Sequence, residues 1–215
     1  LQQELVPVPM DEQRSSLLDH DMGPREQASM DSLAALKPYF DRKNGTVTVG
    51  NASQITDGAA ALLVMGEKEA KKRGLTPLGF IRDYRYAALE PERMGLGPVY
   101  ATAKLLDATK AQMQDFGRIE LNEAFAAQVI ANERSFPSDQ FARERLGRSS
   151  AVGPLDRDIL NVNGGAIALG HPVGMTGARL VLTLLKELHR SGINTGLATL
   201  CVGGGQGAAF FIEVS

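Results

Sequence analysis

Apolar and polar positions alternate in blocks along the second half of the chain and predict strands and helices in turn. Short apolar runs typical of buried strands occupy residues 78–84, 118–121, 159–162, 197–202 and 208–214. Apolar positions at helical spacing occupy residues 99–106, 124–131 and 176–189, the first with Pro98 in its opening turn. The order β-α-β-α-β-α-β-β predicts an α/β layered domain with a mixed sheet, whose last two strands are joined by a glycine turn.

The first 75 residues are expected to be less regular. Residues 1–43 are polar with charges of both signs, and they contain one short helical stretch at 29–36. The apolar run at 59–65 is interpreted as a buried strand, although its periodicity also permits a helix. Residues 67–73 predict a charged surface helix that Gly74 ends.

The predicted helix at 176–189 carries apolar residues around almost its whole circumference as far as Leu185. A helix with this pattern is buried on all sides. The chain after Pro77 supplies about one sheet, so we expect a second sheet, from elsewhere in the protein or from a partner, to cover this helix.

The composition excludes several classes of protein. Of 215 residues, 43% are hydrophobic and 22% charged, which argues against disorder, collagen and coiled coil. The net charge of −2 gives no general attraction to nucleic acid, and no apolar run is long enough to span a membrane. Cys201 is the one cysteine, so we expect no disulfide and no metal site.

The chain opens on Leu1 rather than Met, without the features of a signal or transit peptide. We therefore expect it to be a fragment or a processed product, and we expect a cytoplasmic location.

A glycine-rich stretch at 161–174 carries His171 between a predicted strand and a predicted helix. Glycines let backbone approach a ligand closely, and a histidine there suits acid/base chemistry. The alternative is a structural loop whose histidine only fills space.

A second stretch, Cys201-Val-Gly-Gly-Gly-Gln-Gly, follows a predicted strand. Its backbone N–H groups could bind an oxyanion, although a lone cysteine is most often a small buried apolar residue. Because a strand and not a helix follows, Gly203–Gly205 is not a dinucleotide-binding fingerprint.

A third motif places Asn122 and Glu123 where a strand meets a helix. The plain alternative is a helix cap, since asparagine is a preferred capping residue and glutamate suits the first turn. Met94 stands in a predicted irregular loop and could line a site or simply pack. His20 and His189 are weaker candidates, the latter near a helix C-terminus.

Together these motifs resemble the C-terminal half of a thiolase, an acyl-CoA acyltransferase. The matching stretches are Gly50-Asn-Ala-Ser…Asp57-Gly-Ala-Ala-Ala, Met94-Gly-Leu-Gly-Pro98, Asn122-Glu-Ala-Phe125, Asn161-Val-Asn-Gly-Gly…Gly170-His-Pro and Cys201-Val-Gly-Gly-Gly-Gln-Gly. The resemblance implies a five-layer αβαβα fold made of two similar halves, with a central helical layer between two sheets. It assigns residues 1–45 to the tail of a loop domain, 46–75 to the last strand and helix of the N-terminal half, and 76–215 to the C-terminal half.

The resemblance also implies roles for particular residues. His171 would activate a nucleophilic cysteine and help bind the thioester oxygen, and Asn122 would hold a water in that oxyanion site. Cys201 would exchange a proton with the α-carbon of the acetyl unit, and the backbone N–H of Gly203 would join a second oxyanion hole.

Binding of the coenzyme is implied by the same resemblance. Ser53 and Phe125 would contact the pantetheine arm of CoA, and Met94 would line the pocket. Coenzyme A would be a substrate, with no further cofactor.

Two departures from the family are visible. The nucleophilic cysteine of thiolases lies in their N-terminal half, whereas this chain holds only Cys201. The stretch 129–159 is longer than in compact acetoacetyl-CoA thiolases and resembles thiolases of fatty-acid oxidation, including those bound to a hydratase/dehydrogenase subunit.

We therefore expect an enzyme of β-oxidation type that cleaves 3-ketoacyl-CoA, or runs the reverse condensation, as a homodimer or homotetramer. A non-catalytic acyl-CoA-binding or assembly module is the main alternative. A ketoacyl-synthase-type condensing enzyme is a third, although those relatives lack the Cys-x-Gly-Gly-Gly thiol.

Overall fold

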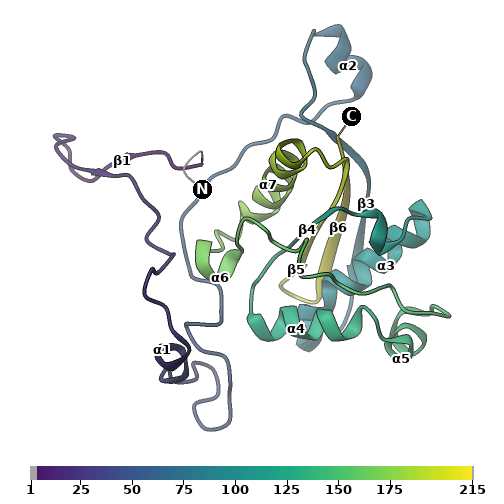
Figure 1. Ribbon diagram of the computed structural model, residues 1–215, viewed down its shortest axis with the longest axis horizontal. Coiled ribbons are helices and arrows are strands. Elements are labelled where there is room, and N and C mark those ends of the chain that lie inside the picture. The colour runs from purple at the N-terminus through teal and green to yellow at the C-terminus, as the bar shows by residue number, and fades with distance from the viewer. Residues whose placement is uncertain (1–3, 215) are drawn as a thin grey trace.

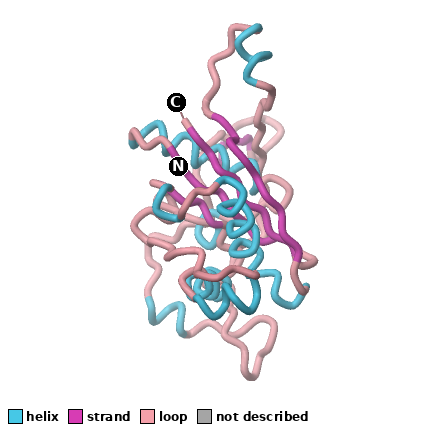
Figure 2. Tube along the Cα trace, turned by 90° about the vertical axis from the view of Figure 1, so that its right-hand side faces the viewer, coloured by secondary structure: helices cyan, strands magenta, loops and turns pink. Residues whose placement is uncertain are grey.

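A four-stranded mixed sheet organises the second half of the chain in the computed structural model, which describes residues 4–214 (Figure 1). The strands are β3 (Phe80–Ala88), β4 (Arg118–Leu121), β5 (Thr195–Val202) and β6 (Gln206–Glu213), in the order β3-β6-β5-β4. β4 runs parallel to β5, while β6 pairs antiparallel with both β5 and β3. The mixed sheet is confirmed, and Figure 2 shows its strands side by side.

One long helix covers each face of this sheet. Helix α3 (Gly97–Thr109) packs on β3 and β6, and α7 (Thr176–Ser191) packs mainly on β5 and β4 (Figure 1). Because side chains alternate along a strand, Leu197 and Phe211 join the core on the α3 side. Their neighbours Ala198 and Ile212 join the second core on the α7 side.

The start of α3 lies directly against β6. A Cβ atom on Gly97 would overlap the backbone of Gln206, and one on Gly207 would overlap the carbonyl of Gly97. Only glycine permits this approach of two backbones. Pro98 occupies the first turn of α3 as predicted, where its missing N–H costs nothing.

Shorter elements connect these helices and strands. They are η1 (Pro91–Leu96) and η2 (Met113–Asp115), both 3₁₀ helices; α4 (Ala126–Ser135), α5 (Asp139–Phe141) and α6 (Ala166–Leu169); and the π-helix η3 (Ala142–Leu146). The Met94 segment, predicted as an irregular loop, is therefore the 3₁₀ helix η1.

The strand predicted at 159–162 is wrong. This stretch makes a single bridge, Leu160 to Ile119 of β4. Asn161 has a positive φ of 46°, and its side-chain amide both accepts from Leu121 N–H and donates to Leu121 C=O, each at 2.9 Å. The side chain of Asn161 thereby makes the hydrogen bonds to Leu121 that the backbone of a further strand residue would make. The observed order of elements therefore lacks the third strand of the predicted β-α-β-α-β-α-β-β series.

The segment before the sheet is largely extended. It contains β1 (Val8–Pro9) paired with β2 (Leu17–Leu18), and helix α1 (Met30–Ala34), which Ser29 caps. Helix α2 (Glu67–Lys72) follows, with Gly74 at a φ of +67° after its end, as predicted.

The buried strand predicted at 59–65 is also wrong, and so is the expectation of a strand within 46–75. Residues 59–65 pair with no strand of the described chain, and Leu63 and Val64 are 80% and 67% exposed. Only Leu62 packs against the α7 core. An apolar run indicates a preference for burial, but a strand also needs a neighbouring strand with free backbone N–H and C=O groups.

Helix α7 is amphipathic rather than apolar all round. Leu180, Leu184 and Leu188 are fully buried against the sheet. The opposite side carries Arg179, Thr183, Lys186, Glu187 and Arg190, which line an open groove. The predicted circumference was too wide because these five polar residues fall together on one arc at 100° per residue. No helix among residues 4–214 has the length and apolar character needed to cross a membrane.

Candidate active site

The end of β4 brings together two of the predicted residues. Asn122 extends the β4–β5 pairing by donating its backbone N–H to Thr199 C=O at 3.0 Å, and its side chain is fully buried. The Asn122 Nδ2 atom lies 3.3 Å from Nε2 of His171. The alternative interpretation of Asn122 as a helix cap is wrong, because Phe125 is the N-cap residue of α4.

His171 lies in a loop between α6 and α7, and two contacts besides the one with Asn122 hold it in place. Its backbone N–H donates to Gln54 C=O at 3.2 Å, and its Nδ1 lies 2.7 Å from Oγ1 of Thr176. Burial, and then the positive charge of Arg179, lower the pKa of His171 below its ordinary value. The ring is therefore neutral at neutral pH.

A buried ion pair joins β4 to α7 close to this histidine. Arg179 Nη1 donates to Glu120 Oε2 at 3.1 Å. Burial raises the pKa of Glu120 to about 7, even though the charge of Arg179 opposes this shift.

The glycine loop that leads to His171 is fixed by Glu123. Asn161 Nδ2 donates to one carboxylate oxygen at 2.9 Å, and the backbone N–H of Ile167 donates to the other at 3.3 Å. A Cβ on Gly165 would overlap this carboxylate. A side chain at position 165 would therefore require the Glu123 carboxylate to move from its hydrogen bonds with Asn161 and Ile167.

Cys201 lies near the end of β5, two residues after the Thr199 carbonyl that binds Asn122. It is buried, and burial raises the pKa of its thiol to about 11. Its side chain is therefore a protonated thiol at neutral pH. Gly203 opens the exposed turn between β5 and β6, in which Gly204 and Gly205 have positive φ angles of 84° and 86°.

The residues predicted to contact CoA lie beside these. Ser53 N–H donates to Ala124 C=O at 2.9 Å, and Ala52 forms a bridge with Phe125, so the extended segment runs along the start of α4. Met94 is half-buried in η1, which packs against α4.

Two family models match this chain, and they divide it close to Gly74. Thiolase, C-terminal domain, matches residues 75–214, and Thiolase, N-terminal domain, matches residues 1–68. The chain belongs to the thiolase family.

Individual thiolases match it over nearly its whole length. The 3-ketoacyl-CoA thiolase of Serratia proteamaculans is 48% identical over 198 residues, which are 92% of this chain and 45% of that protein. Human mitochondrial 3-ketoacyl-CoA thiolase in complex with CoA has a TM-score of 0.78 and 37% identity, over 97% of this chain and 48% of that one. The dimeric peroxisomal thiolase of Saccharomyces cerevisiae has a TM-score of 0.81 and 38% identity, over 99% and 49%. The chain spans about half the length of these thiolases.

Some residues of this candidate site are not indicated by the sequence alone. The sequence predicts Thr176 only as the start of a helix, and Glu123 only as a residue at a strand–helix junction that suits a first turn. Phe40, in a segment described as polar, packs edge-on against Phe125 with ring centroids 6.1 Å apart. Spacing could hint at Thr176, since it lies five residues after His171, but the other contacts join distant parts of the chain.

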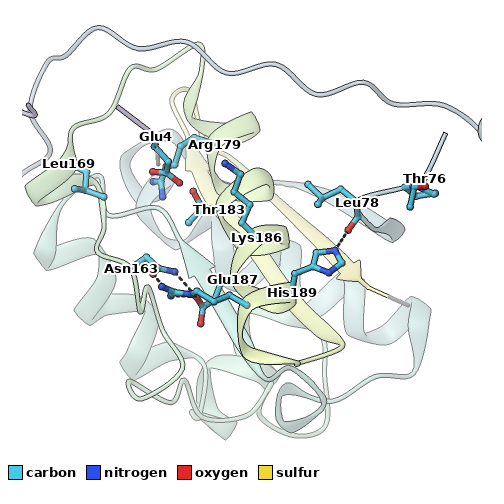
Figure 3. A pocket seen from close by; sticks show the side chains of 12 residues that line it. Glu4, Thr76, Leu78, Asn163, Leu169, Arg179, Thr183, Lys186, Glu187 and His189 are labelled. Atoms are coloured by element: carbon cyan, nitrogen blue, oxygen red, sulfur yellow. Dashed lines mark hydrogen bonds and ion pairs between the residues drawn. The ribbon is translucent and has the colours of Figure 1, made fainter. Parts of the chain in front are cut away.

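A large open groove lies elsewhere, along the polar side of α7 (Figure 3). Its volume is about 1090 Å³, and none of the seven predicted site residues lines it. At its lower edge, burial would raise the pKa of Glu187, but hydrogen bonds from Asn163, Arg118 and Arg190 lower it to about 2. This groove is a surface of charged and hydrogen-bonded side chains, separate from the contact between Asn122 and His171.

Proposed function

We propose that this chain supplies the acid/base and carbonyl-binding groups of a 3-ketoacyl-CoA thiolase. The complete protein would use CoA to cleave a 3-ketoacyl-CoA into acetyl-CoA and a shortened acyl-CoA, or would catalyse the reverse condensation. The observation that carries the proposal is the 3.3 Å contact between Asn122 and His171, which joins two of the thiolase motifs at one partly buried position.

The protonation state of His171 supports its proposed role. A neutral imidazole can accept a proton from the nucleophilic thiol through Nε2 and can then donate that N–H to the thioester oxygen. Asn122 Oδ1 is buried and has no hydrogen-bond partner among residues 4–214. A buried amide oxygen of this kind is suited to holding a water that completes the oxyanion site.

The raised pKa of Cys201 supports the second role. Carbon–carbon cleavage leaves an enolate of the acetyl unit, and a thiol that is still protonated can give its proton to the α-carbon. In the condensation direction the same sulfur, as thiolate, would take that proton back. The backbone N–H of Gly203, in the exposed turn after β5, would stabilise the enolate oxygen.

Binding of CoA is proposed for the surface beside α4. Ser53 and Phe125 lie on neighbouring backbones there, and Met94 would complete the wall. The human relative is described in complex with CoA, which supports CoA as the substrate.

The remaining parts of the function need chain outside these 215 residues. Cys201 is the sole cysteine, so the acyl-accepting cysteine has to come from the portion of thiolases that this chain does not span. A homo-oligomer is proposed because the yeast relative is dimeric. The role in β-oxidation and the hydratase/dehydrogenase subunit remain predictions from the resemblance, and the cytoplasmic location remains a prediction from the N-terminal sequence.

Thiolysis of acetoacetyl-CoA tests this proposal, with the chain combined with the thiolase portion that it lacks. His171→Ala and Cys201→Ala should each lower kcat by about 100-fold or more, the range of a lost acid/base group. His20→Ala and Val202→Ala are matched controls, because His20 is exposed beside Asp19 and Val202 is the partly exposed neighbour of Cys201. Full activity in both site variants would refute the proposal. An assembly that binds acyl-CoA without turnover would favour the non-catalytic module.

A further inference from the structure

The hydroxyl group of Thr176 connects the imidazole of His171 to the backbone of its own loop. Thr176 is the first residue of α7 and is 1% exposed. Its Oγ1 atom lies 2.7 Å from Nδ1 of His171 and donates to the carbonyl of Pro172 at 3.0 Å. The hydroxyl therefore has two neighbours but only one proton to share between them.

The direction of these hydrogen bonds follows from the Pro172 carbonyl, which can only accept. At 3.0 Å this contact has the geometry of a hydrogen bond donated by the Thr176 hydroxyl, to a carbonyl that also accepts from the backbone N–H groups of Met175 at 2.8 Å and Thr176 at 3.0 Å. When the Thr176 hydroxyl donates to Pro172, its Oγ1 accepts from His171. In this arrangement Nδ1 of His171 carries a hydrogen.

The opposite edge of the ring leads to the same assignment. With the proton on Nδ1, Nε2 of the neutral imidazole has a free lone pair. The group that faces it is Nδ2 of Asn122, a donor, at 3.3 Å. A proton on Nε2 instead would set N–H against N–H at this contact and leave the oxygens of Thr176 and Pro172 without a proton between them.

We propose that Thr176 is a positioning residue that fixes the tautomer of His171, with hydrogen on Nδ1 and the lone pair of Nε2 directed toward Asn122. Its catalytic consequence rests on the function proposed above. Only an imidazole with a free Nε2 can take the proton of a nucleophilic thiol on that side, so the hydroxyl keeps the ring ready for this step. Loss of the hydroxyl would let the ring adopt the other tautomer or turn away.

The tautomer can be measured without any activity. We would label histidine with ¹⁵N in this chain only, combine it with the unlabelled portion of thiolase that it does not span, and record two-bond ¹H–¹⁵N correlations of the imidazoles. The chain has three histidines, so His20 and His189 serve as internal references. The expected result is a neutral His171 protonated on Nδ1. A His171 protonated on Nε2 would overturn the proposal.

Variants separate the hydroxyl from the shape of the side chain. Thr176→Val removes the hydroxyl and should shift His171 toward protonation on Nε2, whereas Thr176→Ser should retain the parent spectrum. Thr183→Val is the matched control, because Thr183 is another buried threonine of α7 that lines the groove. An unchanged tautomer in Thr176→Val would also overturn the proposal.

Kinetics give a second, independent readout. Thr176→Val should lower kcat of thiolysis by about 10-fold to 100-fold with KM for CoA changed by less than about 2-fold, since supporting hydrogen bonds are commonly worth this much. Thr176→Ser should restore most of kcat. A low kcat in both variants, or in neither, contradicts the role of the hydroxyl. An inactive parent protein would refute the proposed function, while the tautomer measurement would still decide this inference.

Discussion

Studied on its own, the 215-residue chain is expected to self-associate, because it exposes much more surface than a compact protein of its size. Its accessible surface is 13444 Å², whereas a compact monomer of 23.0 kDa exposes about 9600 Å². Obligate interfaces bury about 2000–5000 Å² counted over both partners, so an excess of about 3800 Å² on one chain is enough surface for such an interface.

The gain from covering this surface can be estimated. If association buried half of the excess and about 55% of that area were apolar, about 1000 Å² of apolar surface would leave water. At about 25 cal/mol per Å² the gross stabilisation is about 25 kcal/mol, which exceeds the cost of about 4–15 kcal/mol for losing free rotation and translation. Self-association should therefore occur even in dilute solution.

Sedimentation velocity over a wide concentration range, together with binding of the dye ANS, measures this behaviour. We expect sedimentation coefficients that rise with concentration and fluorescence typical of exposed apolar surface. Replacing Leu63 and Val64 by serine should weaken association, because each side chain is largely exposed and is worth about 2 kcal/mol when covered. Lys68→Ser, on the exposed helix α2, is the control. A monodisperse monomer that melts cooperatively and binds no dye would refute the reasoning.

Three further predictions concern stability and are measured by urea unfolding of each variant in the same assembly as its parent. Folding raises the pKa of Glu120 to about 7, so the folded state binds a proton that the unfolded state has released between about pH 4.5 and pH 7. Over this range the free energy of unfolding of the parent should fall by up to about 3 kcal/mol relative to Glu120→Gln. Parallel pH profiles of the two proteins would contradict this. Leu184→Ala should cost about 2–5 kcal/mol, since Leu184 is fully buried against the sheet; a cost under about 1 kcal/mol would show a loose core. Gly207→Ala should cost about 1–3 kcal/mol because its Cβ would overlap the Gly97 carbonyl. Gly177→Ala, which has open space around its Cβ, should be neutral or stabilising. Equal effects of the two substitutions would be inconsistent with the close contact at Gly207.

The local chemistry of the sequence was sufficient for much of the sheet and its helices. The strand at 118–121 matches β4, and the predictions for α2, α3, α7, β5 and β6 overlap the observed elements. Side-chain period and turn residues act over a few positions, so they can be interpreted without knowing the rest of the fold. The order of the motifs was likewise sufficient to indicate the thiolase family, because each motif keeps its residue types at fixed spacing.

Only the tertiary structure decided what each segment meets. Residues 59–65 and 159–162 have the composition of strands. The first stretch has no strand to pair with in the described chain, and the second makes one bridge to β4 before the side chain of Asn161 binds the backbone of Leu121. The contacts that define the candidate site join residues far apart in sequence, as Asn122 and His171 do. A preference for burial or for a hydrogen bond is a local property, but its partner is set by packing, which no short window of sequence contains.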